Sequence, residues 1–279
     1  MGEKAQGKQT TYLDFGKTVA GRRTSYDYYE GQEAYDLFMG ARYVSDMIAY
    51  RNGLIEKVFH PEDLRDQNRK YAALTACLPK KKLTFYEVGS SVMGVIDALE
   101  YLNKKYKQLN ISNITFIGVD NSHWMNEIAS YTHEKYKLKL FYNAKDAKNI
   151  TTDLFFAKGV SLMYAFHDEA TMCNALQKSK IAIFDYTFSL KGSVRDIVGT
   201  GLPVSFLNLE KCKKLLEKKG KVLILKPYTI KTYHADPNKI TYDCVYGDED
   251  VVSKYFAELK KKTRETVETY GDPKFIKQR

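Results

Sequence analysis

The sequence has no apolar run that approaches the roughly 20 residues a helix needs to cross a bilayer. Its first residues, MGEKAQGK, also lack the apolar segment of a secretory signal. Both absences disfavour a membrane-spanning or secreted protein, and we expect a cytoplasmic one. A chain of 279 residues can bury a substantial core, either as one large domain or as a standard domain with an additional module.

Cysteine is scarce and scattered, which bears on covalent and metal-based stabilisation. The four cysteines include no C-x-x-C pair, which disfavours a disulfide framework and a thiolate zinc site. The five histidines show neither H-x-x-x-H nor H-E-x-x-H spacing, so we expect no metal. A Walker-A lysine and a G-x-S-x-G serine elbow are also missing, which weakens kinase and hydrolase interpretations.

Positive charge is in excess, with a formal net charge of +10. Such a molecule attracts anions through its long-range field. The densest basic clusters, at residues 211–221 and 260–264, lie in stretches with helical spacing, so a solvated helix face is favoured over a nucleic-acid footprint. The chain also has 22 tyrosines, and aromatic rings can stack on bases or line a small-molecule pocket.

The chain divides by pattern, since it has no internal repeat and no low-complexity linker. Apolar residues recur at helical spacing over residues 31–50 and 61–78. The pattern then changes to short apolar runs that alternate with amphipathic helices, which is typical of a parallel sheet with crossover helices. We therefore predict an N-terminal helical module over residues 1–80, a possible substrate cap, and an α/β domain over residues 81–279.

Within the α/β domain, strands are predicted over residues 83–88, 114–119, 137–141, 154–157, 181–186, 221–227 and 240–245. Helices are expected after the first strand, near Ser122, and over residues 209–219 ahead of Gly220. No helix separates the last two strands, so they are expected to form an antiparallel hairpin that closes the sheet.

The most informative segment is the turn that follows the first strand. Strand residues 83–88 run into Gly89, Ser90 and Ser91 and then into a helix. Small residues let a ligand approach the backbone, and a helix N-terminus presents free N–H groups. Glu87, near the strand end, would repel a pyrophosphate but suits a ligand with an amino or sulfonium group. The second strand ends in Asp120, placed to accept hydrogen bonds from ribose hydroxyls.

Residues 83–245 resemble the class I, seven-stranded S-adenosylmethionine methyltransferases. Glu87-Val88-Gly89-Ser90-Ser91 looks like their first motif, Asp120 like their ribose-binding acid, and residues 154–160 like their fourth-strand motif. The resemblance implies a Rossmann-like, mostly parallel seven-stranded sheet with flanking helices, and S-adenosylmethionine as cofactor. The pattern departs from E-x-G-x-G-x-G, because Ser91 and Met93 occupy the second and third glycine positions.

The resemblance also implies how the cofactor lies. Its amino-acid end would lie near Glu87, Gly89 and Ser90, beside Ser91. Its adenine would lie close to Asp120, Asn121 and the loop from Asn143 to Asp146.

Candidate catalytic groups follow the fourth and fifth strands. Methyl transfer can be accelerated mostly by alignment and desolvation, and a general base helps only when the acceptor is a hydroxyl. His167 is the first candidate base, although a lone histidine is more often a surface or capping residue. Asp185 and Tyr186 are the second candidates, or else a strand-end turn. Arg195 could clamp an anionic acceptor, or pair with Asp196 or a nearby carboxylate.

The acceptor pocket is expected to involve the N-terminal module. Tyr26, Tyr29 and Tyr43 could form a lid, or could pack the module against the sheet. The leading hypothesis is O-methylation of a small molecule or peptide-derived metabolite with an anionic group, such as a peptide C-terminal carboxylate. A nucleic-acid methyltransferase or binding module is the alternative, weakened by the lack of an N-P-P-[YF] motif at the fourth strand. A nicotinamide-dependent oxidoreductase is disfavoured by Glu87 and the missing G-x-G-x-x-G spacing.

Overall fold

The computed structural model describes residues 70–78, 82–90, 93–96, 99–100, 111–121, 123–144, 146, 149–157, 161–197, 203–227 and 237–270. The predicted N-terminal module therefore lies outside the described residues except for its last turns. No helix in the described ranges is long and apolar enough to span a membrane.

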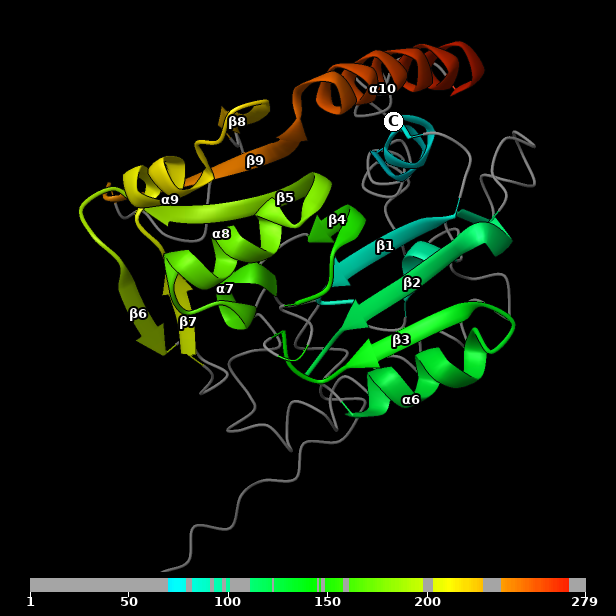
Figure 1. Cartoon of the computed structure of the whole chain (residues 1–279), viewed down its shortest axis with the longest axis horizontal. Coiled ribbons are helices and arrows are strands. Elements are labelled where there is room, and N and C mark those ends of the chain that lie inside the picture. Colours follow the sequence, from blue (N-terminus) through cyan, green and yellow to red (C-terminus); the bar gives the residue numbers. More distant parts are fainter. Residues whose placement is uncertain are drawn as a thin grey trace, which may run out of the picture.

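The centre of the molecule is one seven-stranded sheet with the order β3-β2-β1-β4-β5-β9-β8 (Figure 1). Its strands are β1 (Leu83–Val88), β2 (Ile114–Val119), β3 (Lys137–Phe141), β4 (Thr152–Ala157), β5 (Ser179–Ser189), β8 (Lys221–Pro227) and β9 (Lys239–Asp248). Strands β1 to β5 pair in parallel, and β9 pairs antiparallel with both β5 and β8. The Rossmann-like α/β class and the closing antiparallel hairpin are both confirmed.

The strand bounds agree with the prediction for four of the seven strands of this sheet. Strands β1, β2, β3 and β8 begin and end at the predicted residues. Strands β5 and β9 run farther than predicted and pair from Ile181 with Gly247 to Ser189 with Lys239. Polar residues such as Asp185 and Thr187 stay extended there because the partner strand satisfies their backbone groups.

Helices cover both faces of the sheet. They are α6 (His123–Thr132), α7 (Ser161–Ala165), α8 (Glu169–Gln177), α9 (Leu209–Leu216) and α10 (Glu249–Tyr270), together with helical residues 70–76 and 94–96. Helix α6 begins close to the predicted Ser122. Helix α9 ends before the predicted Lys219, because Glu217 already has an extended backbone with ψ of 110°.

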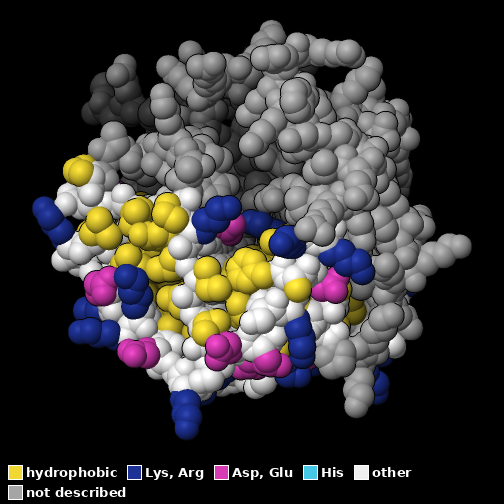
Figure 2. All heavy atoms as spheres, turned by 90° about the horizontal axis from the view of Figure 1, so that it is seen from above, with side chains coloured by type: hydrophobic (Ala, Val, Ile, Leu, Met, Phe, Trp, Pro, Cys, Tyr) yellow, Lys and Arg dark blue, Asp and Glu magenta, His cyan; other side chains and the backbone are white. Residues whose placement is uncertain are grey.

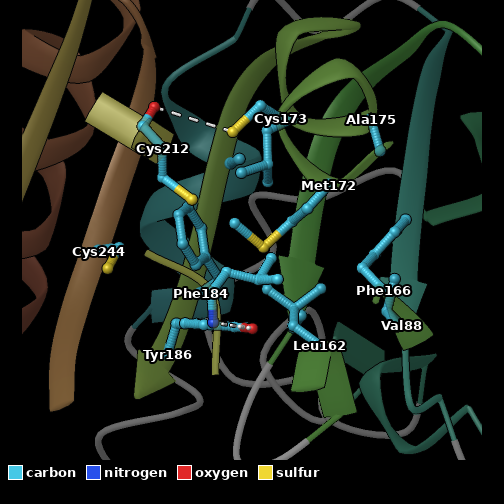
Figure 3. Packing of buried hydrophobic residues seen from close by; sticks show 14 of the residues in the cluster. Val88, Leu162, Phe166, Met172, Cys173, Ala175, Phe184, Tyr186, Cys212 and Cys244 are labelled. Carbon is cyan, nitrogen blue, oxygen red and sulfur yellow. Dashed lines mark hydrogen bonds between the residues drawn. The ribbon is translucent and has the colours of Figure 1, made fainter. Parts of the chain in front are cut away.

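Alternation along the strands separates two apolar cores, one on each face of the sheet. On β5, Phe184 and Tyr186 face the core formed with α7, α8 and α9 (Figure 3). Ile181 and Ile183 face the other core, which contains residues from segment 70–78, α6 and α10. Because residues 70–78 share this core with the sheet, the end of the predicted N-terminal module packs as part of the α/β domain.

The two edges of the sheet differ in chemistry. Strand β3 exposes Lys137 and Lys139, whose charges discourage pairing with another strand. On the side of α9, β8 and α10, Figure 2 shows apolar side chains gathered among charged ones. The exposed large apolar residues of these elements are Leu215, Ile224 and Phe256. A second, two-stranded sheet of β6 (Val194–Ile197) and β7 (Pro203–Phe206) follows β5.

Candidate functional site

Two acidic side chains meet where the first two strands end. Glu87 is the penultimate residue of β1, and Asp120 directly follows β2. The parallel register pairs Glu87 with Gly118 and Val88 with Val119, so both carboxylates lie at the carboxyl edge of the sheet. Both side chains are buried, with 7% of each residue exposed. The two acids that the sequence analysis singles out therefore lie at the same edge of the sheet.

The two oxygens of the Glu87 carboxyl differ in their hydrogen bonding. Tyr71 donates a hydrogen bond from its hydroxyl to Oε1 at 3.0 Å, while Oε2 is buried and has no hydrogen-bond partner within the described chain. The pKa of Glu87 is raised to about 8. Burial is the main cause and the Asp120 charge adds to it, while the hydrogen bond from Tyr71 acts in the opposite direction. A buried carboxyl in this state gains from a cation at Oε2, an atom for which the described residues provide no hydrogen-bond donor.

The backbone of Asp120 is fixed on both sides. Its N–H donates to the carbonyl of Phe141 at 3.1 Å, at the end of β3. Its carbonyl accepts from Nδ2 of Asn126 at 2.9 Å, on α6. Neighbouring elements thus hold the backbone of Asp120 in place at the carboxyl edge of the sheet.

The turn after β1 is closed by its own hydrogen bonds. The N–H groups of Gly89 and Ser90 both donate to the carbonyl of Val119, at 2.8 and 3.1 Å, and the N–H of Met93 donates to the carbonyl of Ser90 at 2.8 Å. Free N–H groups were expected here, and for these three residues that expectation is wrong, because the end of β2 lies close enough to accept them. This part of the turn therefore offers little to a phosphate, which needs converging donors.

Two residues of this turn adopt left-handed backbone conformations. Gly89 has φ of +69°, and a Cβ there would lie 2.0 Å from Oγ of Ser161. Met93 has φ of +58°, which costs a non-glycine residue on the order of 1 kcal/mol. Met93 is fully buried, and burying its side chain offsets that strain by about 1.5–3 kcal/mol. The missing glycine of the motif is thus replaced by a methionine that fills the core.

Two more buried polar atoms near this turn have no hydrogen-bond partner among the described residues. They are Oγ of Ser90 and Oδ1 of Asn126. A Cβ at Gly118 would lie 2.7 Å from Oγ of Ser90, so this hydroxyl sits beside β2. Together with Oε2 of Glu87 they form a group that a ligand can satisfy. We name Tyr71, Glu87, Gly89, Ser90, Asp120 and Asn126 the Glu87 cluster.

A second polar group lies beyond the end of β5. Nδ1 of His167 is 3.0 Å from Oγ of Ser205 on β7. Arg195 on β6 is exposed and pairs in register with Ser205, so the two side chains share one face of the hairpin. The hydroxyl of Tyr186 donates to the carbonyl of Ser205 at 2.5 Å and accepts from the N–H of Leu207 at 3.3 Å. We name His167, Tyr186, Arg195 and Ser205 the Ser205 cluster.

Asp185 and Tyr186 point to opposite faces of the sheet because they are neighbours in a strand. Tyr186 is buried in the core with α7 to α9, and burial raises its pKa well above the ordinary range. Asp185 lies on the face of Ile183 and is paired in register with Asp243 of β9. Asp185 therefore belongs to the same face as Glu87, whereas Tyr186 has a structural position.

The remaining predicted residues divide between surface positions and undescribed segments. Asn121 and Asp146 are exposed, and the N–H of Asp146 donates to the carbonyl of Asn143 at 3.0 Å in the turn after β3. Ser91, Tyr26, Tyr29 and Tyr43 lie outside the described residues.

Two residues of the Glu87 cluster were not singled out from the sequence. Tyr71 lies in the stretch 61–78, whose apolar residues recur at helical spacing, and nothing in that pattern signals a contact of its hydroxyl with a distant acid. Asn126 shares a buried helix face with Ala129 and His133, at spacings of three and four residues, and a polar residue on such a face is the signal that could have revealed it. No group of three or more potential metal ligands occurs among the described residues.

Comparison with known proteins gives only distant likenesses. No family model and no curated protein matches the chain. The structure is similar to the N-terminal domain of EvdMO1 with SAH bound, with a TM-score of 0.46, 14% identity, and coverage of 67% of this chain and 81% of that one. An S-adenosylmethionine-dependent methyltransferase from Clostridium acetobutylicum is similar with a TM-score of 0.41 and 12% identity, over 73% of this chain and 98% of that one. A putative Zn-dependent alcohol dehydrogenase from Rhodobacter sphaeroides is similar with a TM-score of 0.39 and 11% identity, over 66% of this chain and 90% of that one. The fold assignment rests on strand order and register.

Proposed function

We propose that the chain is an S-adenosylmethionine-dependent methyltransferase whose cofactor lies against the Glu87 cluster. The observation that carries the proposal is the meeting of Glu87 and Asp120 at the ends of β1 and β2, with Oε2 of Glu87 buried and without a hydrogen-bond partner in the described chain. This arrangement suits a ligand that has an ammonium group and a ribose. It is the arrangement that the family resemblance implies.

The turn itself supports a cationic ligand over a dinucleotide. The amides of Gly89, Ser90 and Met93 are engaged within the protein, so these three donors are not available to a pyrophosphate. A nicotinamide cofactor would therefore lack these phosphate contacts at the turn. A ligand with an ammonium group and two ribose hydroxyls would donate hydrogen bonds to the Glu87 and Asp120 carboxylates.

The residues expected to hold the cofactor are Glu87, Gly89, Ser90 and Asp120, with Asn121 and Asp146 at the nucleoside end. When bound, S-adenosylmethionine supplies a methyl group on a positively charged sulfur that leaves as a neutral thioether. The protein's part is to align the acceptor and to exclude water.

For the acceptor we propose a hydroxyl or carboxylate of a small molecule or peptide, with anionic character. Arg195 and Ser205 share one face of the hairpin, and the Ser205 hydroxyl meets His167, so a cation and a base stand close together. His167 or Asp185 would take the proton of a hydroxyl acceptor, while Tyr26, Tyr29 and Tyr43 would cover the pocket. Tyr186 is left out, because its hydroxyl is held by backbone groups.

The proposal is tested by calorimetric titration of the full chain with S-adenosylmethionine, S-adenosylhomocysteine and NAD. We expect saturable micromolar binding of the first two and none of NAD. Binding of NAD alone would overturn the proposal.

A nucleic-acid acceptor is the second candidate, and the edge formed by α6 and β3 favours it. Tyr131 and Tyr142 are 83% and 51% exposed, and Lys137 and Lys139 are exposed close by. Aromatic rings among lysines can bind single strands by stacking and by phosphate contacts. RNA binding that weakens steeply with salt would favour this candidate, whereas weak binding at all salt concentrations would support the small acceptor.

A further inference from the structure

The helical residues 70–76 precede the sheet and reach the acid of the cofactor site. Tyr71 is 2% exposed and lies in the same core as β1 and β4. Its ring centroid is 4.7 Å from that of Phe156 and 6.0 Å from that of Phe85. The ring is thus held by packing on two strands, and the direction of its hydroxyl towards Glu87 is fixed.

The start of this helical turn is anchored to the far side of the sheet. Nζ of Lys70 is 2.7 Å from Oδ2 of Asp243 on β9, and both side chains are largely buried, at 14% and 26% exposure. Adjacent residues therefore touch β1 and β9, which lie three strands apart in the sheet. A turn tied at both points cannot shift without breaking a partly buried ion pair.

We propose that Tyr71 is a positioning residue of the cofactor site, which holds Oε1 of Glu87 by its hydroxyl and leaves Oε2 for the cationic end of the cofactor. The proposal rests on the proposed function, and it adds the last turn of the predicted N-terminal module to the cofactor site. The hydroxyl also acts on the charge of Glu87, since a donor stabilises the ionised carboxylate more than the neutral acid.

The effect of the Tyr71 hydroxyl on Glu87 can be measured through the pH dependence of ligand affinity, given the groups that face Glu87. Tyr71 faces it from segment 70–76, Asp120 from the end of β2, and the register neighbours are Gly118 on β2 and Phe156 on β4. Tyr71 is the donor in this set and Asp120 is the like charge. Removal of the hydroxyl therefore raises the pKa of Glu87, and a cationic ligand then needs a higher pH to bind.

The test compares Tyr71→Phe with the wild-type chain and with Tyr246→Phe. The matched control removes a buried hydroxyl that has no hydrogen-bond partner in the described chain and lies in the other core. S-adenosylhomocysteine is titrated over about pH 6.5 to 9.5. The midpoint of each curve of affinity against pH is set by the pKa of Glu87. Below this midpoint the affinity falls roughly tenfold for each pH unit. The ligand's own ammonium titrates alike with all three proteins, so it cancels in the comparison.

We expect the midpoint of Tyr71→Phe to move to higher pH, with several-fold weaker binding at neutral pH and convergence with the wild type at high pH. Tyr246→Phe should follow the wild type throughout. A Tyr71→Phe curve that is lower at every pH with the same midpoint would show a packing role and overturn the proposal.

A second readout separates this proposal from the proposed function. If the wild type binds no S-adenosylhomocysteine at any pH, the proposed function fails. The thermal unfolding midpoint of the ligand-free proteins still reports the Tyr71 effect, because its decline with rising pH should end at a higher pH in Tyr71→Phe than in the wild type. Identical unfolding profiles would contradict the contact between Tyr71 and Glu87 in solution.

Discussion

The Glu87 cluster lies where β1 and β2 end, and the Ser205 cluster lies between β5 and the two-stranded sheet, yet the two clusters use their polar groups differently. In the Glu87 cluster, buried atoms of Glu87, Ser90 and Asn126 have no hydrogen-bond partner in the described chain. In the Ser205 cluster, the hydroxyl of Tyr186 both donates and accepts, and the Ser205 hydroxyl meets His167. Buried polar groups are costly when unpaired, so the first cluster would gain from hydrogen bonds with a ligand, whereas the buried hydroxyl of Tyr186 in the second is already satisfied by the protein.

The largest expected effect sharpens this contrast through pH. The raised pKa of Glu87, about 8 against 4.5, means that the folded state holds a proton that the unfolded state releases. The stability that this proton gives is full below about pH 4.5 and is lost as the pH rises through about 8, in total on the order of 5 kcal/mol. Glu87→Gln removes this titration, so its unfolding free energy should decline less over this pH window. Chemical denaturation of both proteins along the window measures it, and parallel profiles would contradict the buried acid.

Gly89→Ala should break the Glu87 cluster sterically. A Cβ at φ of +69° would meet Oγ of Ser161 at 2.0 Å, and strain with a clash costs about 3 kcal/mol of unfolding free energy. Gly94 is the matched control, because a Cβ there meets nothing within 4 Å and alanine favours the helix by up to about 1 kcal/mol. Denaturant midpoints of the two variants should move in opposite directions, and equal shifts would argue against the turn geometry.

Tyr186→Phe tests the structural role assigned to the Ser205 cluster. Loss of the bonds to Ser205 and Leu207 should lower the unfolding free energy by about 1–2 kcal/mol. The affinity for S-adenosylhomocysteine should stay within about twofold, which is under 0.5 kcal/mol. A large loss of affinity with unchanged stability would move Tyr186 into the cofactor site.

His167→Ala should have the smallest effect on stability and on cofactor binding. His167 is exposed and has the contact to Ser205, so we expect a change of unfolding free energy within about 0.5 kcal/mol and an unchanged cofactor affinity. Thermal unfolding and titration measure both quantities. A marked fall in cofactor affinity would indicate that the two clusters belong to one binding site.

Local sequence patterns predict much of this contrast between the two clusters, and the rest depends on tertiary contacts. Strand ends place Glu87 and Asp120, because parallel strands bring their carboxyl ends to one edge. Period-two alternation alone separates Asp185 from Tyr186. The hydrogen bond from Tyr71 joins residues of two elements, and the contact between His167 and Ser205 spans 38 positions. No local pattern predicts either contact, nor the engagement of the turn amides by Val119.

The most direct measurement is the titration of S-adenosylhomocysteine into three proteins: the wild type, Asp120→Asn and Ser205→Ala. Asp120→Asn keeps the shape of the side chain but loses charge-assisted hydrogen bonds to the ribose, so affinity should fall on the order of a hundredfold. Ser205→Ala should bind as the wild type does. Unchanged affinity in Asp120→Asn, or an equal loss in Ser205→Ala, would contradict the placement of the cofactor at the Glu87 cluster.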